Sequence, residues 1–247
     1  MAPSRLIIAG HSHTVALAGP AHADAPALRP LAADPSVVHL VGPWPRDPHY
    51  WEALVREAAG AATVILFGGN EHNHYFLFQS ARPFDFVPSN DPGAPLEPGA
   101  ELVPEAMIRA KYGLTLGSLS HILGRLRRRP STRIAVCGTP PPKADESFMR
   151  AILAAEPDLV ARAAQLGQDV ASVPITPYEL RFKLWRLLQD CLREIAEKAG
   201  CGFVAVPDIV YTPGGGLARE FWAEDASHAN DAYGAVMLDH LRRALAA

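Results

Sequence analysis

Short apolar segments alternate with longer amphipathic segments along most of the chain. Five apolar runs are rich in Val, Ile, Leu and Ala, and they cover residues 5–10, 36–42, 62–69, 133–138 and 202–208. Runs of this length and composition predict buried β-strands. Apolar residues at helical spacing predict helices over 50–60, 116–129, 178–200 and about 231–245. Repeated strand–helix units predict an α/β fold, with a mostly parallel, five-stranded sheet covered by helices on both faces.

Two segments interrupt this alternation. Residues 75–112 are dense in Pro, Gly and aromatic side chains, and residues 143–177 have a more helical pattern. A long irregular insertion in a compact domain is commonly a functional loop or a disordered one, and the aromatic residues favour a packed loop. Because no repeat or low-complexity tract divides the chain, residues 1–247 are predicted to form one domain with these two insertions.

Composition excludes several classes of function. The 247 residues are 49% hydrophobic, which is enough to bury a sizeable core. A net charge of −3 leaves no broad basic field for nucleic acid or for an anionic membrane surface. The three cysteines have no CxxC spacing, and no apolar stretch has the length of a signal peptide core or a membrane span. We therefore expect a soluble, cytoplasmic protein.

Polar residues follow several of the predicted strands at the point where each strand ends. "GHSH" with Ser12 follows the first strand, Gly42 ends the second, and "GGNEHN" with Asn70 follows the third. Asp225 and His228, in "DASHAND", come just before the final helix. Ligands of open parallel sheets bind beyond the carboxyl ends of the strands. These residues are therefore predicted to converge on one edge of the sheet.

The chemistry of the converging residues is complementary. A serine hydroxyl such as that of Ser12 needs a base, and His228 can accept its proton. Asp225 can hold the imidazole in the useful tautomer. The side-chain amide of Asn70 and the backbone N–H groups of Ser12 and Gly42 can stabilise an oxyanion. Each residue alone has a plainer explanation as a helix cap, turn residue or surface residue, so only the joint pattern favours catalysis.

The order of these blocks resembles that of the SGNH hydrolase superfamily, the GDSL-type esterases and lipases. The resemblance covers nearly the whole chain, and it implies an SGNH/flavodoxin-like three-layer α/β/α sandwich. It also implies roles for five residues, with Ser12, His228 and Asp225 as catalytic triad and Gly42 and Asn70 as oxyanion donors. The "DASHANDAYG" block is its most specific part, because the family tends to place a glycine in the helix after its histidine.

Two positions depart from the family pattern. His11 stands where the family usually has Asp before its serine, and Glu71 stands where it usually has Asp after its asparagine. Neither departure removes the nucleophile or the base. The histidine does change the hydrogen bonding expected around Ser12.

A metal site is the main alternative for the opening "GHSH" motif. Two His-x-His pairs, His11 with His13 and His72 with His74, follow neighbouring strands, and such clusters can bind zinc or a pair of transition metals. The early strands end without the carboxylates that usually complete such sites. We therefore expect no metal and no cofactor. We expect His11, His13, His72 and Trp222 to contact the substrate.

The expected activity is that of a serine esterase that hydrolyses a short acyl ester, such as an O-acetyl group on a carbohydrate. An O-acyltransferase that uses the same triad, and a non-catalytic domain that binds a glycan or a partner, are the alternatives. The expected partner is a small-molecule or glycan ester, with no role for nucleic acid or membrane. The sequence leaves open the oligomeric state and whether residues 75–112 line the substrate pocket.

Overall fold

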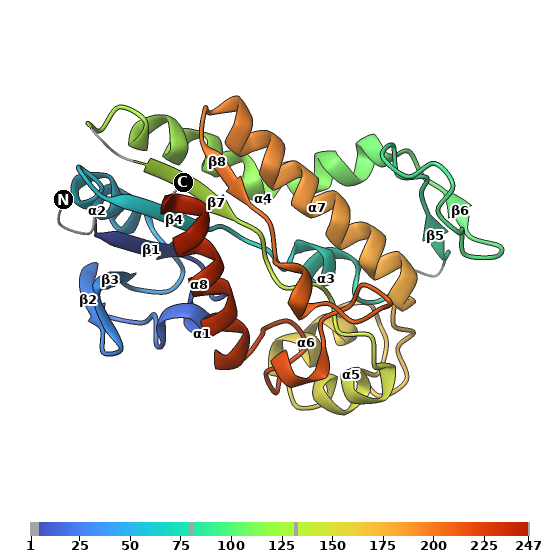
Figure 1. Ribbon diagram of the computed structural model, residues 1–247. Coiled ribbons are helices and arrows are strands. Elements are labelled where there is room, and N and C mark those ends of the chain that lie inside the picture. Colours follow the sequence, from blue (N-terminus) through green and yellow to red (C-terminus); the bar gives the residue numbers. More distant parts are fainter. Residues whose placement is uncertain (1–4, 80–81, 131–132, 247) are drawn as a thin grey trace.

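A computed structural model describes residues 5–79, 82–130 and 133–246 of the chain. Its central sheet has the strand order β2-β3-β1-β4-β7-β8 (Figure 1). The strands are β1 Leu6–Gly10, β2 Ala27–Leu31, β3 Asp34–Val41, β4 Ala62–Leu66, β7 Arg133–Cys137 and β8 Gly202–Val204. Neighbouring strands pair in parallel except β2 and β3, which pair antiparallel. The predicted α/β fold with a mostly parallel sheet is therefore confirmed.

The predicted number of strands is wrong, because the described sheet has six strands rather than five. The additional strand, β2, lies at the edge of the sheet and pairs only with β3. Its sequence, "ALRPL", contains Pro30 and is largely exposed. Edge strands tolerate proline and need no continuous apolar run, so the pattern that identified the five buried strands could not identify this one.

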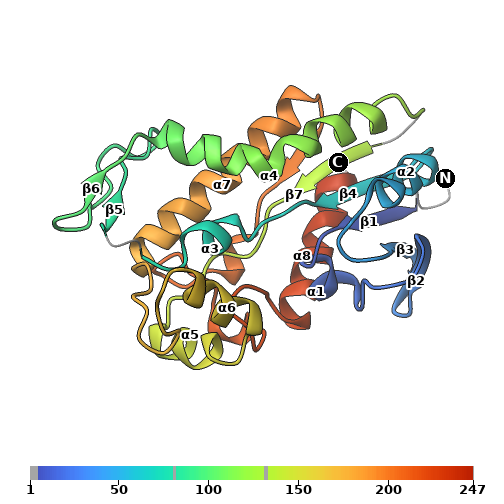
Figure 2. The same ribbon diagram turned by 180° about the vertical axis from the view of Figure 1, so that it is seen from behind.

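Helices cover both faces of the sheet (Figures 1 and 2). The first layer consists of α2 Pro48–Glu57, α4 Glu105–Leu126 and α7 Tyr178–Lys198, and the second consists of α1 Thr14–Ala18 and α8 Asp231–Ala246. Alternate residues of β1 serve the two layers. Ile7 belongs to the hydrophobic core shared with the first layer, and Ile8 belongs to the core shared with the second. Burial on both faces explains why the central strands are continuously apolar.

The second insertion is helical, as its sequence predicts, and it forms α5 Glu146–Leu153 and α6 Pro157–Gln165. Together with α3 Glu71–Phe76, these helices lie beyond the carboxyl ends of the strands (Figure 1). A third hydrophobic cluster joins this region to the turn before α8. Met149 and Leu153 of α5 pack in it with Leu77 and Ala226. The insertion therefore touches the predicted catalytic segment.

The first insertion includes two short paired strands, β5 Phe84–Asp85 and β6 Glu101–Leu102, and its last residues belong to α4. Helix α4 begins at Glu105 rather than at the predicted 116, because Ile108 and Tyr112 extend its buried face. The paired strands lie at the opposite end of the molecule from β2 (Figure 1). A buried ion pair anchors them, with Lys183 Nζ 2.5 and 2.7 Å from the carboxylate oxygens of Asp85.

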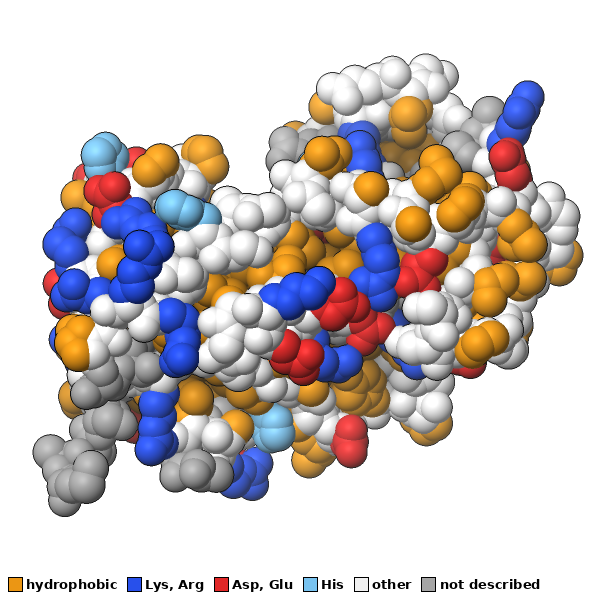
Figure 3. All heavy atoms as spheres, turned by 90° about the horizontal axis from the view of Figure 1, so that it is seen from above, with side chains coloured by type: hydrophobic (Ala, Val, Ile, Leu, Met, Phe, Trp, Pro, Cys, Tyr) orange, Lys and Arg blue, Asp and Glu red, His pale blue; other side chains and the backbone are white. Residues whose placement is uncertain are grey.

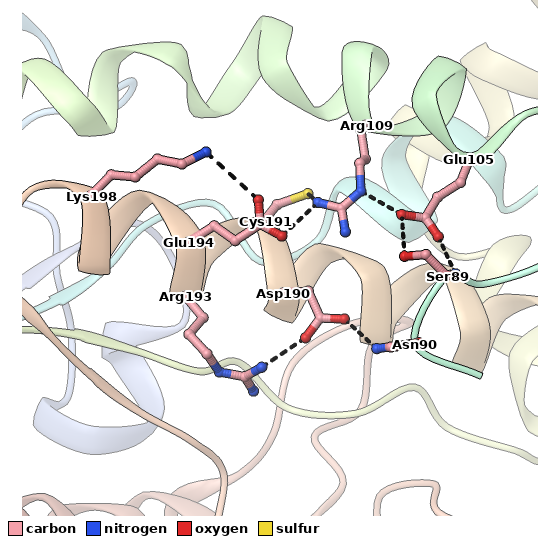
Figure 4. Close-up of polar contacts among 9 residues, drawn as sticks. All are labelled: Ser89, Asn90, Glu105, Arg109, Asp190, Cys191, Arg193, Glu194 and Lys198. Atoms are coloured by element: carbon pink, nitrogen blue, oxygen red, sulfur yellow. Dashed lines mark hydrogen bonds and ion pairs between the residues drawn. The ribbon is translucent and has the colours of Figure 1, made fainter.

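Polar contacts complete the anchoring of this insertion to α4 and α7 (Figure 4). Glu105 accepts hydrogen bonds from the amide and hydroxyl of Ser89, and Arg109 bridges Glu105 and Glu194. Further pairs on this face are Asn90–Asp190, Arg193–Asp190 and Lys198–Glu194. Seen from above, this face shows interleaved acidic and basic side chains (Figure 3). These contacts therefore hold most of the first insertion against α4 and α7.

Within the described residues, we find no helical segment with both the length and the apolar character that a membrane span requires.

Candidate active site

Ser12 lies in the turn between β1 and α1, where the chain leaves the carboxyl edge of the sheet. The turn is fixed because the amide of His11 donates to Leu66 O of the neighbouring strand at 2.8 Å. The hydroxyl Oγ of Ser12 lies 2.7 Å from His228 Nε2, although 216 positions separate the two residues in the chain. The structure therefore brings the predicted nucleophile and the predicted base within hydrogen-bonding distance.

Asp225 lies on the other side of the imidazole. Its Oδ2 is 2.9 Å from His228 Nδ1, and its Oδ1 accepts the backbone amides of Ser227 and His228 at 2.7 and 2.6 Å. Burial alone would raise the pKa of Asp225. The hydrogen bond and charge of the His228 ring, together with the two amides, outweigh burial and hold this pKa well below its usual range. The carboxylate therefore stays ionised and favours the tautomer whose Nε2 faces Ser12 as an acceptor.

Asn70 immediately precedes α3 and directly follows the Gly68–Gly69 turn after β4. Its side-chain amide nitrogen donates to no described residue, so it is available to a ligand. The buried carboxylate of Glu71 shapes this turn, because it accepts the amide of Gly69 at 2.7 Å. Burial raises the pKa of Glu71, and the backbone amides around it oppose that effect. The residue that replaces the family aspartate thus has a structural role beside the predicted oxyanion donor.

The expectation for Gly42 does not fit the structure. Its amide already donates to Ala21 O at 3.0 Å, so it is not free to stabilise an oxyanion. A Cβ at this position would lie 2.8 Å from the Tyr50 ring, which gives the glycine a packing role instead. The guanidinium of Arg46 also binds Gly42 O at 2.7 Å and holds the loop in place. The amide of Ser12, in contrast, meets no described acceptor and remains a candidate donor.

His11 is a packed, neutral ring rather than an exposed substrate contact. Its Nδ1 accepts the amide of Gly68 at 2.9 Å. Burial, aided by the charge of Arg46, lowers the pKa of His11 to about 4. The ring is surrounded by the aromatic side chains of Trp44, Trp51 and Phe67. His11 therefore connects the turn after β1, which carries Ser12, to the turn that leads to Asn70.

His13 and His72 are buried, and neither ring makes a hydrogen bond to any described residue. The His13 ring lies 5.0 Å from the His228 ring and lines the depression beside Ser12. Burial, followed by the charge of His228, lowers the pKa of His13 well below its usual value. Burial, followed by the charge of Arg181, lowers the pKa of His72 to about 3. His13 thus fits the expected place beside a substrate, whereas His72 lines neither this depression nor the one beside Asn70.

Trp222 does not line the depression beside Ser12. Its indole N–H donates to Leu217 O at 2.7 Å, and its ring packs against Phe148 and under the guanidinium of Arg219. The expected substrate contact is therefore replaced by a packing role behind the Asp225 turn.

The four histidines of the metal hypothesis have different environments. His11 lies among aromatic rings, His13 and His72 are buried, and His74 is exposed. Within residues 5–79, 82–130 and 133–246, no group of three or more His, Cys, Asp or Glu side chains is arranged to hold a metal ion.

Two depressions flank the Ser12–His228–Asp225 chain. The first has a volume of about 530 Å³ and lies between the ends of α1 and α8, with Ser12, His13 and His228 in its wall. The second, of about 570 Å³, has polar and charged residues in its wall: Asn70, Asn73, His74, Glu156, Arg162 and Ser227. Tyr75 and Leu77 are the described residues of the first insertion that reach it. Most of residues 75–112 therefore do not line the candidate site.

Buried Lys143 and half-buried Glu156 also belong to the site, and the sequence did not indicate either of them. Lys143 Nζ donates to the carbonyl oxygens of Ala223 and Asp225, and Glu156 accepts the amide of Ala226. Both residues come from the second insertion. A lysine directly after the "TPPP" run that follows β7 was the available signal, but a single lysine in a loop is ordinarily a surface residue.

Comparison with solved structures places this arrangement among known folds. An extracellular lipase from Streptomyces rimosus superposes with a TM-score of 0.51 at 13% identity, covering 98% of this chain and 100% of that one. A variant of an acetyl-xylooligosaccharide esterase from Geobacillus superposes with a TM-score of 0.50 at 11% identity, covering 97% and 93%. The chain has the SGNH-hydrolase fold. No family model matches the sequence, and no curated protein matches it.

Within this fold, the polar blocks of the sequence lie next to the sheet and the last helix. Ser12 follows β1, Asn70 follows β4, and Asp225 and His228 precede α8. At identities of 11% and 13%, the comparisons establish the fold alone. The chemistry of this chain therefore has to be argued from its own residues.

Proposed function

We propose that the protein is a carboxylic ester hydrolase that acts through Ser12, His228 and Asp225. The observation that carries this proposal is the continuous hydrogen-bond chain from Ser12 Oγ through both imidazole nitrogens to the Asp225 carboxylate. A solvent-accessible depression adjoins the serine end of that chain. A serine paired with an oriented base beside an open depression has the parts needed for nucleophilic catalysis.

The first half of the reaction forms an acyl-enzyme. Ser12 Oγ attacks the acyl carbon while His228 Nε2 accepts the hydroxyl proton. The resulting oxyanion accepts hydrogen bonds from the side-chain amide of Asn70 and the amide of Ser12, neither of which is engaged by a described acceptor. As the ester bond breaks, the imidazolium donates its proton to the departing alkoxide. Asp225 stabilises the imidazolium throughout, because its carboxylate remains ionised.

In the second half, water attacks the acyl carbon and His228 accepts its proton. The tetrahedral intermediate collapses, Ser12 regains its proton, and the carboxylic acid leaves. The half-exposed His228 and the open depression beside it admit water to this step. No cofactor enters this scheme.

We propose a small, polar ester as substrate. The 570 Å³ depression presents amides, a carboxylate and a guanidinium beside a few apolar side chains, and these polar groups suit the hydroxyl groups of a carbohydrate. The acetyl-xylooligosaccharide esterase of the same fold acts on such an ester. A short acyl group on a sugar hydroxyl is therefore the first substrate class to test.

The test combines turnover with covalent labelling of the serine. Purified protein is assayed with p-nitrophenyl esters of two to twelve carbons and with peracetylated sugars, and it is treated with a fluorophosphonate. We expect turnover of the shortest esters, release of acetate from the sugars, and one phosphonyl group per chain on Ser12. Ser12→Ala should lose both turnover and labelling. Ser118→Ala, which removes a serine hydroxyl at an exposed position of α4, is the matched control and should keep both.

The outcomes separate the alternatives. Turnover that requires an added sugar acceptor indicates an acyltransferase on the same triad. A folded protein without turnover and without labelling contradicts the proposal and leaves the non-catalytic binding domain.

A further inference from the structure

The turn that carries Asp225 is held by a buried lysine. Lys143 has 1% of its surface exposed, and its Nζ lies 2.6 Å from Ala223 O and 2.5 Å from Asp225 O. Its own carbonyl oxygen accepts a hydrogen bond from Arg181 Nη1 at 3.1 Å, which ties this segment to α7. Burying an ammonium group is costly unless polar partners compensate. The two carbonyl oxygens are such partners, and both belong to the Asp225 turn.

A carboxylate binds the other side of the same turn. Glu156 Oε1 accepts the amide of Ala226 at 2.8 Å. The carbonyl of Asp225 and the amide of Ala226 are the two halves of one peptide group. Lys143 and Glu156 therefore hold a single peptide plane from its acceptor side and from its donor side.

The orientation of this peptide plane affects the Asp225 carboxylate directly. Asp225 Oδ1 accepts the amides of Ser227 and His228, so the turn closes on its own carboxylate. Rotation of the peptide that joins Asp225 to Ala226 would move those amides and the carboxylate together. The 2.9 Å contact between Asp225 and His228 Nδ1 would then lengthen.

The charges around Lys143 make its protonation sensitive to pH. Burial is the largest influence and lowers the pKa of Lys143 to about 8, the charge of Arg219 adds to this effect, and the charges of Asp225 and Glu156 oppose it. The ammonium also lies 5.3 and 5.7 Å from the ring centres of Phe148 and Trp222. Above this pKa the group is an uncharged amine with two N–H donors, and a neutral donor binds carbonyl oxygens more weakly than a charged one.

We propose that Lys143 and Glu156 form a clamp on the peptide between Asp225 and Ala226, and that this clamp positions the catalytic carboxylate against His228. This inference rests on the proposed function for its catalytic consequence. It assigns a role to the second insertion, residues 143–177, which supplies both halves of the clamp. Lys143 and Glu156 are positioning residues, because neither contacts the Ser12 hydroxyl or the His228 ring.

The test compares two variants of Lys143, Lys143→Met and Lys143→Arg, and two of Glu156, Glu156→Gln and Glu156→Ala, with wild type. We expect Lys143→Met to lower kcat about 10- to 100-fold with KM nearly unchanged, since a misplaced catalytic group costs about that much. Lys143→Arg retains the charge and is expected to recover most of kcat. Glu156→Gln retains an oxygen acceptor for Ala226 and should lose less than threefold, whereas Glu156→Ala should resemble Lys143→Met.

The pH profile separates positioning from general destabilisation. Wild-type kcat should fall as the pH rises through about 8, and Lys143→Arg should lack this alkaline decline because arginine stays charged. The matched control is Lys183→Met, which removes a second buried lysine whose partners lie in the first insertion. It should lower the unfolding midpoint while leaving kcat per folded molecule and the pH profile unchanged.

A double-mutant cycle with Asp225→Asn tests the route of action. If Lys143 acts through Asp225, Lys143→Met should cost less than about threefold in kcat when Asp225 is already asparagine. The urea midpoints of the same four proteins should show the same pattern. Lys143→Met should lower the midpoint less when Asp225 is already asparagine than when it is aspartate. Equal losses in both backgrounds, or an unchanged kcat in a folded Lys143→Met protein, would overturn the clamp. If wild type lacks esterase activity, the proposed function fails, and the midpoint cycle still decides whether the clamp exists.

Discussion

Gly234 of α8 lies directly against the backbone of Ala16 in α1. A Cβ at position 234 would lie 1.6 Å from Ala16 O, which no real atom could occupy. The two helices begin close to His228 and Ser12, respectively, so their approach affects the distance between base and nucleophile. The absence of a side chain at Gly234 thus lets α1 and α8 approach each other beside the candidate site.

We expect Gly234→Ala to impair both stability and catalysis. The added methyl group forces α8 away from α1, which should lower the free energy of unfolding by about 1–3 kcal/mol and kcat/KM by up to about 100-fold. Urea denaturation and ester turnover measure the two effects. Gly117→Ala in α4, where a Cβ meets no atom within 4 Å, should retain full activity. Wild-type behaviour of Gly234→Ala would show that the helix approach does not set the site.

Ser12 and His228 should behave as one unit. We expect Ser12→Ala, His228→Ala and the double variant to lose similar amounts of kcat, because each breaks the same proton transfer. Asp225→Ala should cost about tenfold less than His228→Ala, since it only orients and stabilises the imidazole. Steady-state kinetics on a short p-nitrophenyl ester measure all four. A double variant far worse than either single one would contradict the assignment.

Asp225 should also contribute to stability in a pH-dependent way. Its pKa is lower in the folded protein than in the unfolded chain, so its contribution is present above the ordinary Asp value of about 3.9 and is lost as the pH falls through the lower folded value. The difference in unfolding free energy between wild type and Asp225→Asn should therefore be largest near pH 7 and shrink below pH 4. Urea titrations at pH 7, 5, 4 and 3 check this trend. A difference that grows on acidification would contradict it.

Histidines that the fold keeps neutral should make the protein sensitive to acid. His11 and His39 have pKa values lowered from 6.5 to about 4, mainly by burial. Between these values the unfolded chain binds protons that the folded protein does not, so stability should fall as the pH drops from about 6.5 to 4. His11→Asn can still accept from Gly68, and it should reduce this slope by up to about 1.4 kcal/mol per pH unit. An unchanged slope in His11→Asn would contradict burial of a neutral ring at this position.

Chelation should leave activity unchanged. The proposed oxyanion donors are the side chain of Asn70 and the amide of Ser12, and neither requires a metal ion. Prolonged dialysis against EDTA, followed by assay with and without added Zn²⁺ or Mn²⁺, tests this expectation. If activity were lost on dialysis and restored by either ion, the result would favour the two His-x-His pairs as metal ligands.

Local sequence determined the scaffold, because burial imposes periodic patterns that can be read without knowing contacts. The five apolar runs became β1, β3, β4, β7 and β8, since strands covered on both faces must be apolar throughout. The order of the polar blocks around Ser12, Asn70, Asp225 and His228 could also be recognised from the sequence alone. The edge strand β2 could not be recognised in this way, because its half-exposed residues do not form a continuous apolar run.

Tertiary structure decided what each polar group does, because hydrogen-bond partners distant in sequence leave no local signal. Only the folded backbone shows that Ala21 O engages the Gly42 amide, or that Lys143 reaches Asp225 O across 82 positions. His72 was expected at the site, yet it is buried and lines neither of the two depressions. Sequence thus determined which chemistry is present, whereas packing determined which groups are free to perform it.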